Sequence, residues 1–400
     1  MGHALPAPIQ IGRDEDPVLW LKLIRSRRVG SVTFHRLCVD HGGVEAALKA
    51  LPEIARAAGV EGYETCPLQI VRAELKAGRE ARARLLLHGR PGYPGTLMDL
   101  ADAPPVLWAR GNETLLLRDM VALVGARNAS SLGLRMARRL AEGIVEAGPV
   151  VVSGLARGID AAAHQAALSG GTVAVMAGGV DVIYPEENTA LAALIAEQGC
   201  LVSEQPMGTQ PQTRHFPQRN RIISGLARAV VVVEAASRSG SLITAREALD
   251  QGREVMAVPG HPFDARAAGC NQLIREGAIL VRGPHDVLEV LGLQHVLAAG
   301  RPQNPQNPQN PQNPQDPPDP ETPQPVDPVL PGRNPGPRAL ADVATLHNLI
   351  LSRLGPSPTA EDQLIRDLSM PPAAMAQALV TLELEGHIQR QAGGLLSRLD

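Results

Sequence analysis

The sequence predicts an α/β protein with an extended, doubly wound and mostly parallel Rossmann-like sheet at its centre. Apolar strands alternate with helical patterns from residue 119 to residue 285, the rhythm of parallel strands joined by helices. The strands are almost continuous apolar runs, as expected for strands buried on both faces. We expect a small helical domain (1–90), the Rossmann-like domain (91–298), a linker (299–337) and a winged-helix domain (338–400).

The first ninety residues are expected to form short helices, in a domain resembling a SAM or helix-hairpin-helix domain, followed by a bridging segment. The helical segments are VLWLKLI, SVTFHRLCVDHG, GVEAALKAL and PEIARAAG. Val29 and Gly30 resemble the hairpin between two small helices, which can offer backbone N–H groups to a DNA phosphate. A plain helical bundle with a glycine turn is the simpler explanation of Gly30 by itself.

The central domain is expected to contain seven strands and the helices between them. The predicted strands are Met120–Val124, Val150–Val152, Thr172–Met176, Cys200–Val202, Ala229–Val233, Glu254–Ala257 and Ile279–Val281. The predicted helices are Leu132–Glu146, Ile159–Leu168, Glu186–Gln198, Ser241–Gln251 and Gln272–Glu276.

The C-terminal quarter begins with a repeated Asn-Pro-Gln sequence, in which proline at every third position forbids helix and sheet. We expect an extended tether there. Beyond it the sequence indicates, in order, helical spacing over Arg338–Leu351, a helix over Ala360–Leu368, a third helix from Pro372 to about Glu385 and the hairpin HIQRQAGGLLSRL. Three helices and a hairpin in this order predict a winged helix.

Composition limits the possible classes of protein. The 400 residues exceed one ordinary domain, and the net charge of −3 gives no global sign of nucleic-acid binding. The four cysteines lack metal-ligand spacing, so we expect reduced thiols and no metal. No signal peptide or membrane span is expected, which favours the cytoplasm.

Lysine is absent from the predicted α/β region, where Lys22, Lys49 and Lys76 all precede the first strand. This excludes a P-loop lysine and a Schiff-base lysine from the sheet. Any phosphate bound there must contact arginine or backbone N–H groups.

Two glycine-rich turns follow the first two strands, VGARNAS with Gly125 and Arg127 and VSGLARGID with Gly154 and Arg157. Open α/β sheets bind ligands at the carboxyl ends of their strands, where helix N-termini favour anions. Glycines that only permit close packing are the alternative. Neither turn has the GxGxxG pattern, so no dinucleotide cofactor is expected.

The segment Thr213–Ile223 combines positive charge with an aromatic ring in a stretch without acidic residues. Its candidate DNA-binding residues are Arg214, Phe216, Arg219, Asn220 and Arg221. Arginines can contact phosphates while an unpaired base stacks on the ring, which is typical of single-strand binding.

Structural roles for the same segment stay open. Phe216 could anchor a loop in the core, and we expect Arg219 or Arg221 to pair with Glu204 or Glu234.

Two further motifs lie at helix starts. Ser239 and Ser241, after the strand AVVVVEA, could form another phosphate-binding nest, although Ser241 could equally be an N-cap. Asp160 and His164 share one helix face, where a satisfied hydrogen bond is a simpler role than a catalytic dyad.

The motifs VGARN, VSGLARGID, AGGVDVIYP, FPQRNRIISGL, VVEAASRSGSLITA and VPG, in this order, resemble the DNA-processing protein DprA (Smf) family over about residues 90–285. The resemblance implies a protein that binds incoming single-stranded DNA in natural transformation and loads RecA recombinase onto it. It also implies homodimers formed through the Rossmann-like domain and no catalysis. By position, the DNA-binding arginine would be Arg127 and the aromatic residue of the pocket Phe216.

The expected recognition helix, Pro372–Glu385, contains no lysine or arginine. A helix that reads DNA should present positive charge to the phosphates, so we expect this winged helix to contact protein or support a dimer. The alternative function is an enzyme, a nucleotide phosphoribohydrolase of the lysine-decarboxylase-like group, whose PGGxGTxxE turn the SRSGSLITARE segment resembles incompletely.

Overall fold

The computed structural model describes two compact units, Met1–Gln294 and His295–Asp400, which are treated separately here. Within them the structure describes residues 16–293, 347–354, 359–368, 375, 378–379, 381–383, 385–391 and 395–398. The predicted linker, residues 299–337, lies outside the described residues. None of the helices in the described ranges is long and apolar enough to cross a membrane.

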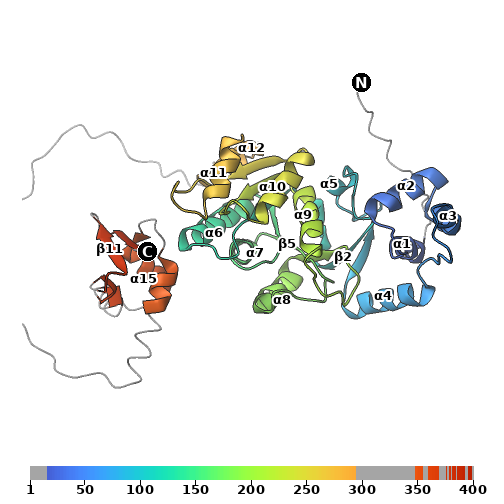
Figure 1. Ribbon diagram of the computed structural model, residues 1–400, viewed down its shortest axis with the longest axis horizontal. Helices are drawn as coiled ribbons and strands as arrows, with labels where there is room; N and C mark the ends of the chain where they lie inside the picture. The colour runs from blue at the N-terminus through green and yellow to red at the C-terminus, as the bar shows by residue number, and fades with distance from the viewer. Residues whose placement is uncertain are drawn as a thin grey trace, which may run out of the picture. The chain divides into compact units, whose positions relative to one another are not determined.

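Four helices open the first unit, α1 (Pro17–Ile24), α2 (Ser31–His41), α3 (Val44–Ala57) and α4 (Leu68–Glu80). They share a buried core with strand residues, in which Trp20 and Phe34 pack with Val106 and Trp108. Figure 1 shows these helices, in blue, grouped beside strand β2. The predicted break before Pro52 was wrong, because α3 continues through this proline with Leu51 and Ala55 buried on one face.

A nine-stranded sheet forms the centre of this unit, in the order β1-β2-β6-β5-β4-β3-β7-β8-β9. Its strands are β1 (Arg84–Leu87), β2 (Val106–Gly111), β3 (Met120–Val124), β4 (Val150–Ser153), β5 (Thr172–Val175), β6 (Cys200–Ser203), β7 (Ala229–Val232), β8 (Glu254–Ala257) and β9 (Ile279–Leu280). The seven predicted strands are parallel, whereas β1 and β2 add an antiparallel edge that was not predicted.

Helices cover both faces of the sheet, and alternate strand residues point to opposite sides. On one face Val121 and Leu123 pack with α6 (Ser131–Glu146), α7 (Ile159–Ala167) and α12 (Pro284–Val290). On the other, Ala122 and Val124 pack in a core that includes residues of α9, α10 and α11. The bounds of the remaining helices are α5 (Gly95–Met98), η1 (Glu113–Leu117), η2 (Glu186–Asn188), α8 (Thr189–Gln198), α9 (His215–Leu226), α10 (Ser241–Asp250) and α11 (Ala268–Arg275).

The strand order reverses its direction at β3, which has β4 on one side and β7 on the other. The chain winds outward from β3 through β4, β5 and β6, and then returns to place β7 beside β3. In open α/β sheets a crevice forms at such a switch point, outside the carboxyl ends of the strands. The loops that follow β3 and β7 therefore occupy the expected ligand-binding position.

The second unit has the elements of a winged helix. A helix over residues 347–353 is followed by β10 (Thr359–Ala360), α15 (Glu361–Leu368), β11 (Ile388–Gln391) and β12 (Leu395–Arg398). The strands form a sheet of order β10-β12-β11, and its antiparallel β11–β12 pair matches the predicted hairpin. The residues of the predicted third helix that the structure describes, 375, 378–379 and 381–383, are helical.

Candidate nucleic-acid interface

Two adjoining cavities lie at the switch point. The larger has a volume of about 620 Å³ and the smaller about 260 Å³. They share Arg127, Ala156, Phe216 and Arg219 as lining residues. The larger cavity is also lined by predicted site residues Gly125, Asn220, Ser239 and Ser241, and the smaller by Gly154 and Arg157. We call the two cavities together the groove.

Arg127 stands on the turn after β3, and the start of α7 holds this turn in place. The N–H of Ile159 donates to the carbonyl of Ala126 at 3.2 Å. Gly158, with φ +76°, lies so close that a Cβ there would collide with the carbonyls of Ala126 and Arg127. The Arg127 side chain is exposed, and within the described part of the chain it has no acidic partner. Its guanidinium carbon lies 5.4 Å from the centre of the Phe216 ring, within cation–π range.

The second turn directs its backbone N–H groups inward. Gly154 and Ala156 donate to the buried carboxylate of Asp160 at 3.1 and 3.4 Å. Leu155, with φ +55°, donates to Nε2 of His164 at 3.3 Å. These N–H groups are therefore not free for an anion, contrary to the expectation from sequence.

His164 and Asp160 each accept hydrogen bonds from this turn and do not form a catalytic dyad. With Nε2 of His164 accepting, Nδ1 donates to the Thr172 hydroxyl at 2.7 Å, and that hydroxyl donates to the Val151 carbonyl at 3.0 Å. Burial lowers the pKa of His164 to about 3, so the ring is neutral. The simpler structural role predicted for the pair is confirmed.

The N-terminus of α6 is also occupied by the protein's own groups. Ser130 Oγ accepts from the N–H of Gly133 at 3.0 Å, and the Glu234 carboxylate accepts from the Ser130 hydroxyl at 2.6 Å. A carboxylate thus stands where a bound anion was expected, and α6 offers no phosphate site.

The arginine-rich segment forms helix α9, which was not predicted, and its arginines lie on different sides of that helix. Arg219 is only 6% exposed and donates to the Val175 carbonyl at 2.9 Å. Its guanidinium fills the space that a side chain on Gly154 would need. Burial lowers the pKa of Arg219 to about 10 and raises that of Asp160, while their opposite charges act against both shifts. Arg219 therefore supports the floor of the groove.

Arg221 lies outside the groove. Its guanidinium pairs with Glu204 at 2.6 Å and with Asp102 at 3.2 Å, in a separate cavity beside the α1–α2 hairpin. One arginine of the segment was expected to pair with Glu204, and Arg221 does so. Arg214 is exposed, lies 3.5 Å from His215, and lines neither cavity.

The loop after β7 forms the opposite wall of the larger cavity. The hydroxyls of Ser239 and Ser241 lie 2.7 Å apart. At the start of α10 the N–H of Ser241 donates to the Ser239 hydroxyl at 3.4 Å, and those of Leu242 and Ile243 donate to the carbonyls of Ser239 and Gly240 at 3.1 Å. The exposed Arg238 lies in the same loop. This wall thus combines two hydroxyls with a guanidinium, groups that can contact a phosphate.

Among the lining residues that were not predicted as site residues, Arg238 and Tyr184 have side chains suited to nucleic-acid binding. Arg238 belongs to the SRSGS motif, so its positive charge could have identified it as a candidate phosphate-binding residue. Tyr184 lines the smaller cavity, and its ring centre lies 5.7 Å from that of Phe216. The rarity of aromatic residues in the α/β region could have identified Tyr184 as a candidate site residue.

The charges around the larger cavity favour an anion. Arg127 and Arg238 are exposed, whereas Arg266 is paired with Asp264 at 3.1 Å and Asp160 is buried beside Arg219. The uncompensated charge in this cavity is thus positive, although the chain as a whole carries −3.

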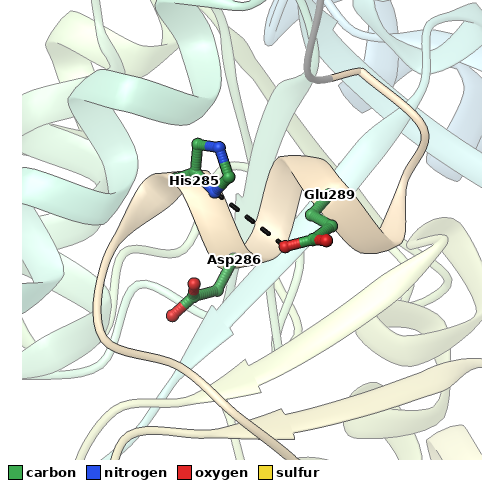
Figure 2. A group of neighbouring side chains, drawn as sticks. All are labelled: His285, Asp286 and Glu289. Atoms are coloured by element: carbon green, nitrogen blue, oxygen red, sulfur yellow. Dashed lines mark ion pairs between the residues drawn. The ribbon is translucent and has the colours of Figure 1, made fainter.

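One cluster among the described residues has the spacing of metal ligands, His285, Asp286 and Glu289 on the short helix α12. Figure 2 shows His285 facing Glu289 while the Asp286 carboxylate points away from both. Asp286 is engaged by Arg282, which donates to it from its backbone and its guanidinium at 2.7–3.1 Å. The cluster thus offers two ligand side chains, fewer than a protein metal site usually supplies.

The fold and the groove define a Rossmann-like protein with a positively charged, ring-lined groove at its switch point. Residues 84–292 match the family model for the DNA recombination-mediator protein A, residues 14–77 a DprA-like N-terminal HHH domain, and residues 334–394 the DprA winged helix domain. The chain belongs to the DNA recombination-mediator protein A (DprA, or Smf) family.

Named relatives support this membership. Protein Smf of Synechocystis sp. is 32% identical over 395 residues, which cover 95% of this chain and 98% of the relative. DNA processing protein DprA of Streptococcus pneumoniae is 48% identical over 198 residues, 49% of this chain and 70% of the relative. The X-ray structure of that species' DprA matches with a TM-score of 0.52 and 36% identity, covering 65% of this chain and 98% of the solved one.

Proposed function

We propose that the chain binds single-stranded DNA in the groove. Phosphates contact Arg127, Arg238 and the hydroxyls of Ser239 and Ser241, and an unpaired base stacks on Phe216. The observation that carries the proposal is the exposed guanidinium of Arg127, which lies over the half-buried Phe216 ring at the sheet's switch point. A base that is paired and stacked in a duplex could not stack on the Phe216 ring inside the groove, so the groove favours a single strand.

The finer proposal follows the family. The chain protects incoming single-stranded DNA in the cytoplasm during natural transformation and loads RecA recombinase onto it. The named relatives are DNA-processing proteins, which supports this class of role. Mixing the chain with DNA and RecA should shorten the lag of filament formation, and an unchanged lag would remove this part of the proposal.

We also propose a homodimer formed through the Rossmann-like domain. Strand β9 lies at the edge of the sheet, and its residues Ile279 and Leu280 are 37% and 42% exposed. An apolar edge strand with unpaired backbone groups favours pairing with a second strand. Leu280→Lys should shift the chain from dimer to monomer in sedimentation, and a parent that is itself monomeric would contradict the dimer.

The binding experiment uses the double variant Arg127→Ala/Phe216→Ala and a fluorescent oligothymidylate. Loss of one stacked base and one phosphate contact should weaken binding at least about tenfold, since stacking alone contributes about 1–3 kcal/mol per base. Arg127→Ala alone should also reduce the salt dependence, by about 0.7 in the slope of log K against log salt. Arg138→Ala, which removes an exposed charge from α6, is the control. Equal binding by parent and double variant would contradict the site.

We propose that the chain is not a phosphoribohydrolase. A hydrolase of this kind needs a carboxylate that can reach a substrate beside the SRSGS loop. In the larger cavity, which this loop lines, the acidic residue Asp160 is buried and accepts from the N–H groups of Gly154 and Ala156, while Glu187 belongs to the smaller cavity and pairs with Arg157. Nucleoside monophosphates incubated with the chain should stay intact. Release of free base would favour the enzyme.

A further inference from the structure

The two cavities of the groove differ in charge. In the larger cavity Arg127 and Arg238 have no acidic partner among the described residues. In the smaller cavity Arg157 pairs with Glu187 at 3.4 Å, and both side chains are about half exposed. Arg127 lines both cavities, so the smaller cavity adds no unpaired charge of its own, whereas the larger one adds Arg238. A phosphate is therefore favoured in the larger cavity more than in the smaller one.

We propose that the smaller cavity is a base-binding subsite in which Tyr184 provides a second stacking ring, next to Phe216. This inference rests on the proposed single-strand binding. The ligand is the nucleobase adjacent to the one that stacks on Phe216, while the phosphate between them lies near Arg127.

The position of Tyr184 supports a stacking role. Its ring lies 5.7 Å from that of Phe216 at an interplanar angle of 57°, so the two rings form a continuous wall along the groove. Tyr184 is 51% exposed, and within the described part of the chain its hydroxyl has no hydrogen-bond partner. A half-exposed ring without a polar anchor gains from being covered by another flat, apolar surface.

The size and the polar groups of the cavity limit its ligand. Its volume of about 260 Å³ lies below the range of about 300–1,000 Å³ found for pockets that hold whole drug-sized ligands. A single base fits this description better than a nucleotide. Gly154, Ala156 and Pro185 give flat walls, and the Glu187 carboxylate can accept from an amino or imino group of a base.

The Arg157–Glu187 pair would also change on binding. A base that donates to Glu187 takes over the role of the Arg157 guanidinium, which is then free to contact the next phosphate. The pair thus keeps Arg157 beside the cavity until a strand is bound.

The test compares Tyr184→Ala, Tyr184→Leu and Tyr184→Phe with the parent, using oligothymidylate and a fully abasic strand of the same length. Tyr184→Ala and Tyr184→Leu should each weaken oligothymidylate binding about tenfold, because one stacked base is lost. Tyr184→Phe should bind like the parent, because the hydroxyl has no partner. Leucine keeps the packing against Phe216, so a loss shared by both variants does not reflect misfolding.

The abasic strand isolates the base. Parent and Tyr184→Leu should bind it equally, since it offers nothing to stack. Two results would overturn the subsite: unchanged oligothymidylate binding by Tyr184→Leu, or an equal loss on both strands. A failure of the proposed function is different, because the Arg127→Ala/Phe216→Ala variant would then also bind like the parent.

Discussion

Gly154 and Arg219 show how a glycine can serve a site without touching its ligand. The Arg219 guanidinium occupies the space beside the Gly154 backbone that a Cβ would fill. From there it reaches the Val175 carbonyl and lies close to Asp160, which binds the N–H of Gly154. The glycine that sequence reasoning assigned to DNA binding thus makes room for a buried arginine.

Gly154→Ala should therefore destabilise the fold. The added methyl group must displace a buried guanidinium, and overpacking of this kind costs about 1–3 kcal/mol. Denaturant unfolding measures the change, with Gly95→Ala as the control, because nothing lies within 4 Å of a Cβ at that position. Equal stability of the two variants would show that the space beside Gly154 is not filled as described.

His164 should make stability depend on pH. Burial lowers its pKa from 6.5 to about 3, so between these values the unfolded state binds a proton that the folded state does not. The contribution of His164 to the free energy of unfolding is complete above pH 6.5. It is lost as the pH falls below this value, by about 1.4 kcal/mol per pH unit. His88, whose pKa is lowered to about 4 by burial, acts in the same direction.

Unfolding in denaturant at pH 7.5 and pH 5.5 checks this. The difference between the free energies of unfolding at the two pH values should be about 1.4 kcal/mol smaller in His164→Gln than in the parent. A parent with no loss between the two pH values would contradict the buried neutral ring.

Three side chains of helix α9 have different roles, although they lie close together in the sequence. Phe216 borders the groove, Arg219 lies beneath it, and Arg221 faces Glu204 and Asp102 in another cavity. The sequence predicted Phe216, Arg219 and Arg221 as candidate site residues but not the faces of the helix on which they lie. Pro217 and the mixture of arginines with asparagine hide the helical period, so the exposure of each arginine could not be predicted.

Arg221→Ala should act on stability more than on DNA. It leaves Glu204, which is largely buried, without its main partner, and breaking a buried pair costs about 3–5 kcal/mol. Arg127→Ala should do the reverse, with weaker binding and near-parent stability. Unfolding and oligonucleotide titration of both variants separate these outcomes, and a pure binding loss in Arg221→Ala would place it in the interface.

The sheet shows what the strand pattern can predict. Strands β3 to β7 stand out because both faces are buried and their apolar runs are continuous, and β8 follows this pattern after its exposed Glu254, whereas β9 is exposed at the edge of the sheet. Strands β1 and β2 lie at the antiparallel edge, and the prolines and glycines around them conceal their pairing. Arg84–Leu87 also precedes residue 90, so the sheet begins inside the segment predicted as the helical domain.

Over the whole chain, the division into two compact units predicts that the first binds DNA without the second. A variant ending at residue 294 should retain single-strand affinity within about twofold, because the phosphate contacts proposed here all lie in the first unit. Gel-shift competition between single strand and duplex, with and without residues 338–400, measures this. A large loss on truncation would assign DNA contacts to the winged helix.

Arg25 ties the first helices to the sheet. Its guanidinium bonds the carboxylate of Glu74 on α4 and the carbonyl of Glu204, while the Trp108 indole of β2 donates to the same carboxylate. Such a clamp leaves the α1–α2 hairpin and the groove at one fixed separation. If one nucleic-acid strand contacted both the hairpin and the groove, it would need a minimum length to span the distance between them. The fraction of protein bound to oligonucleotide would then rise sharply at that length.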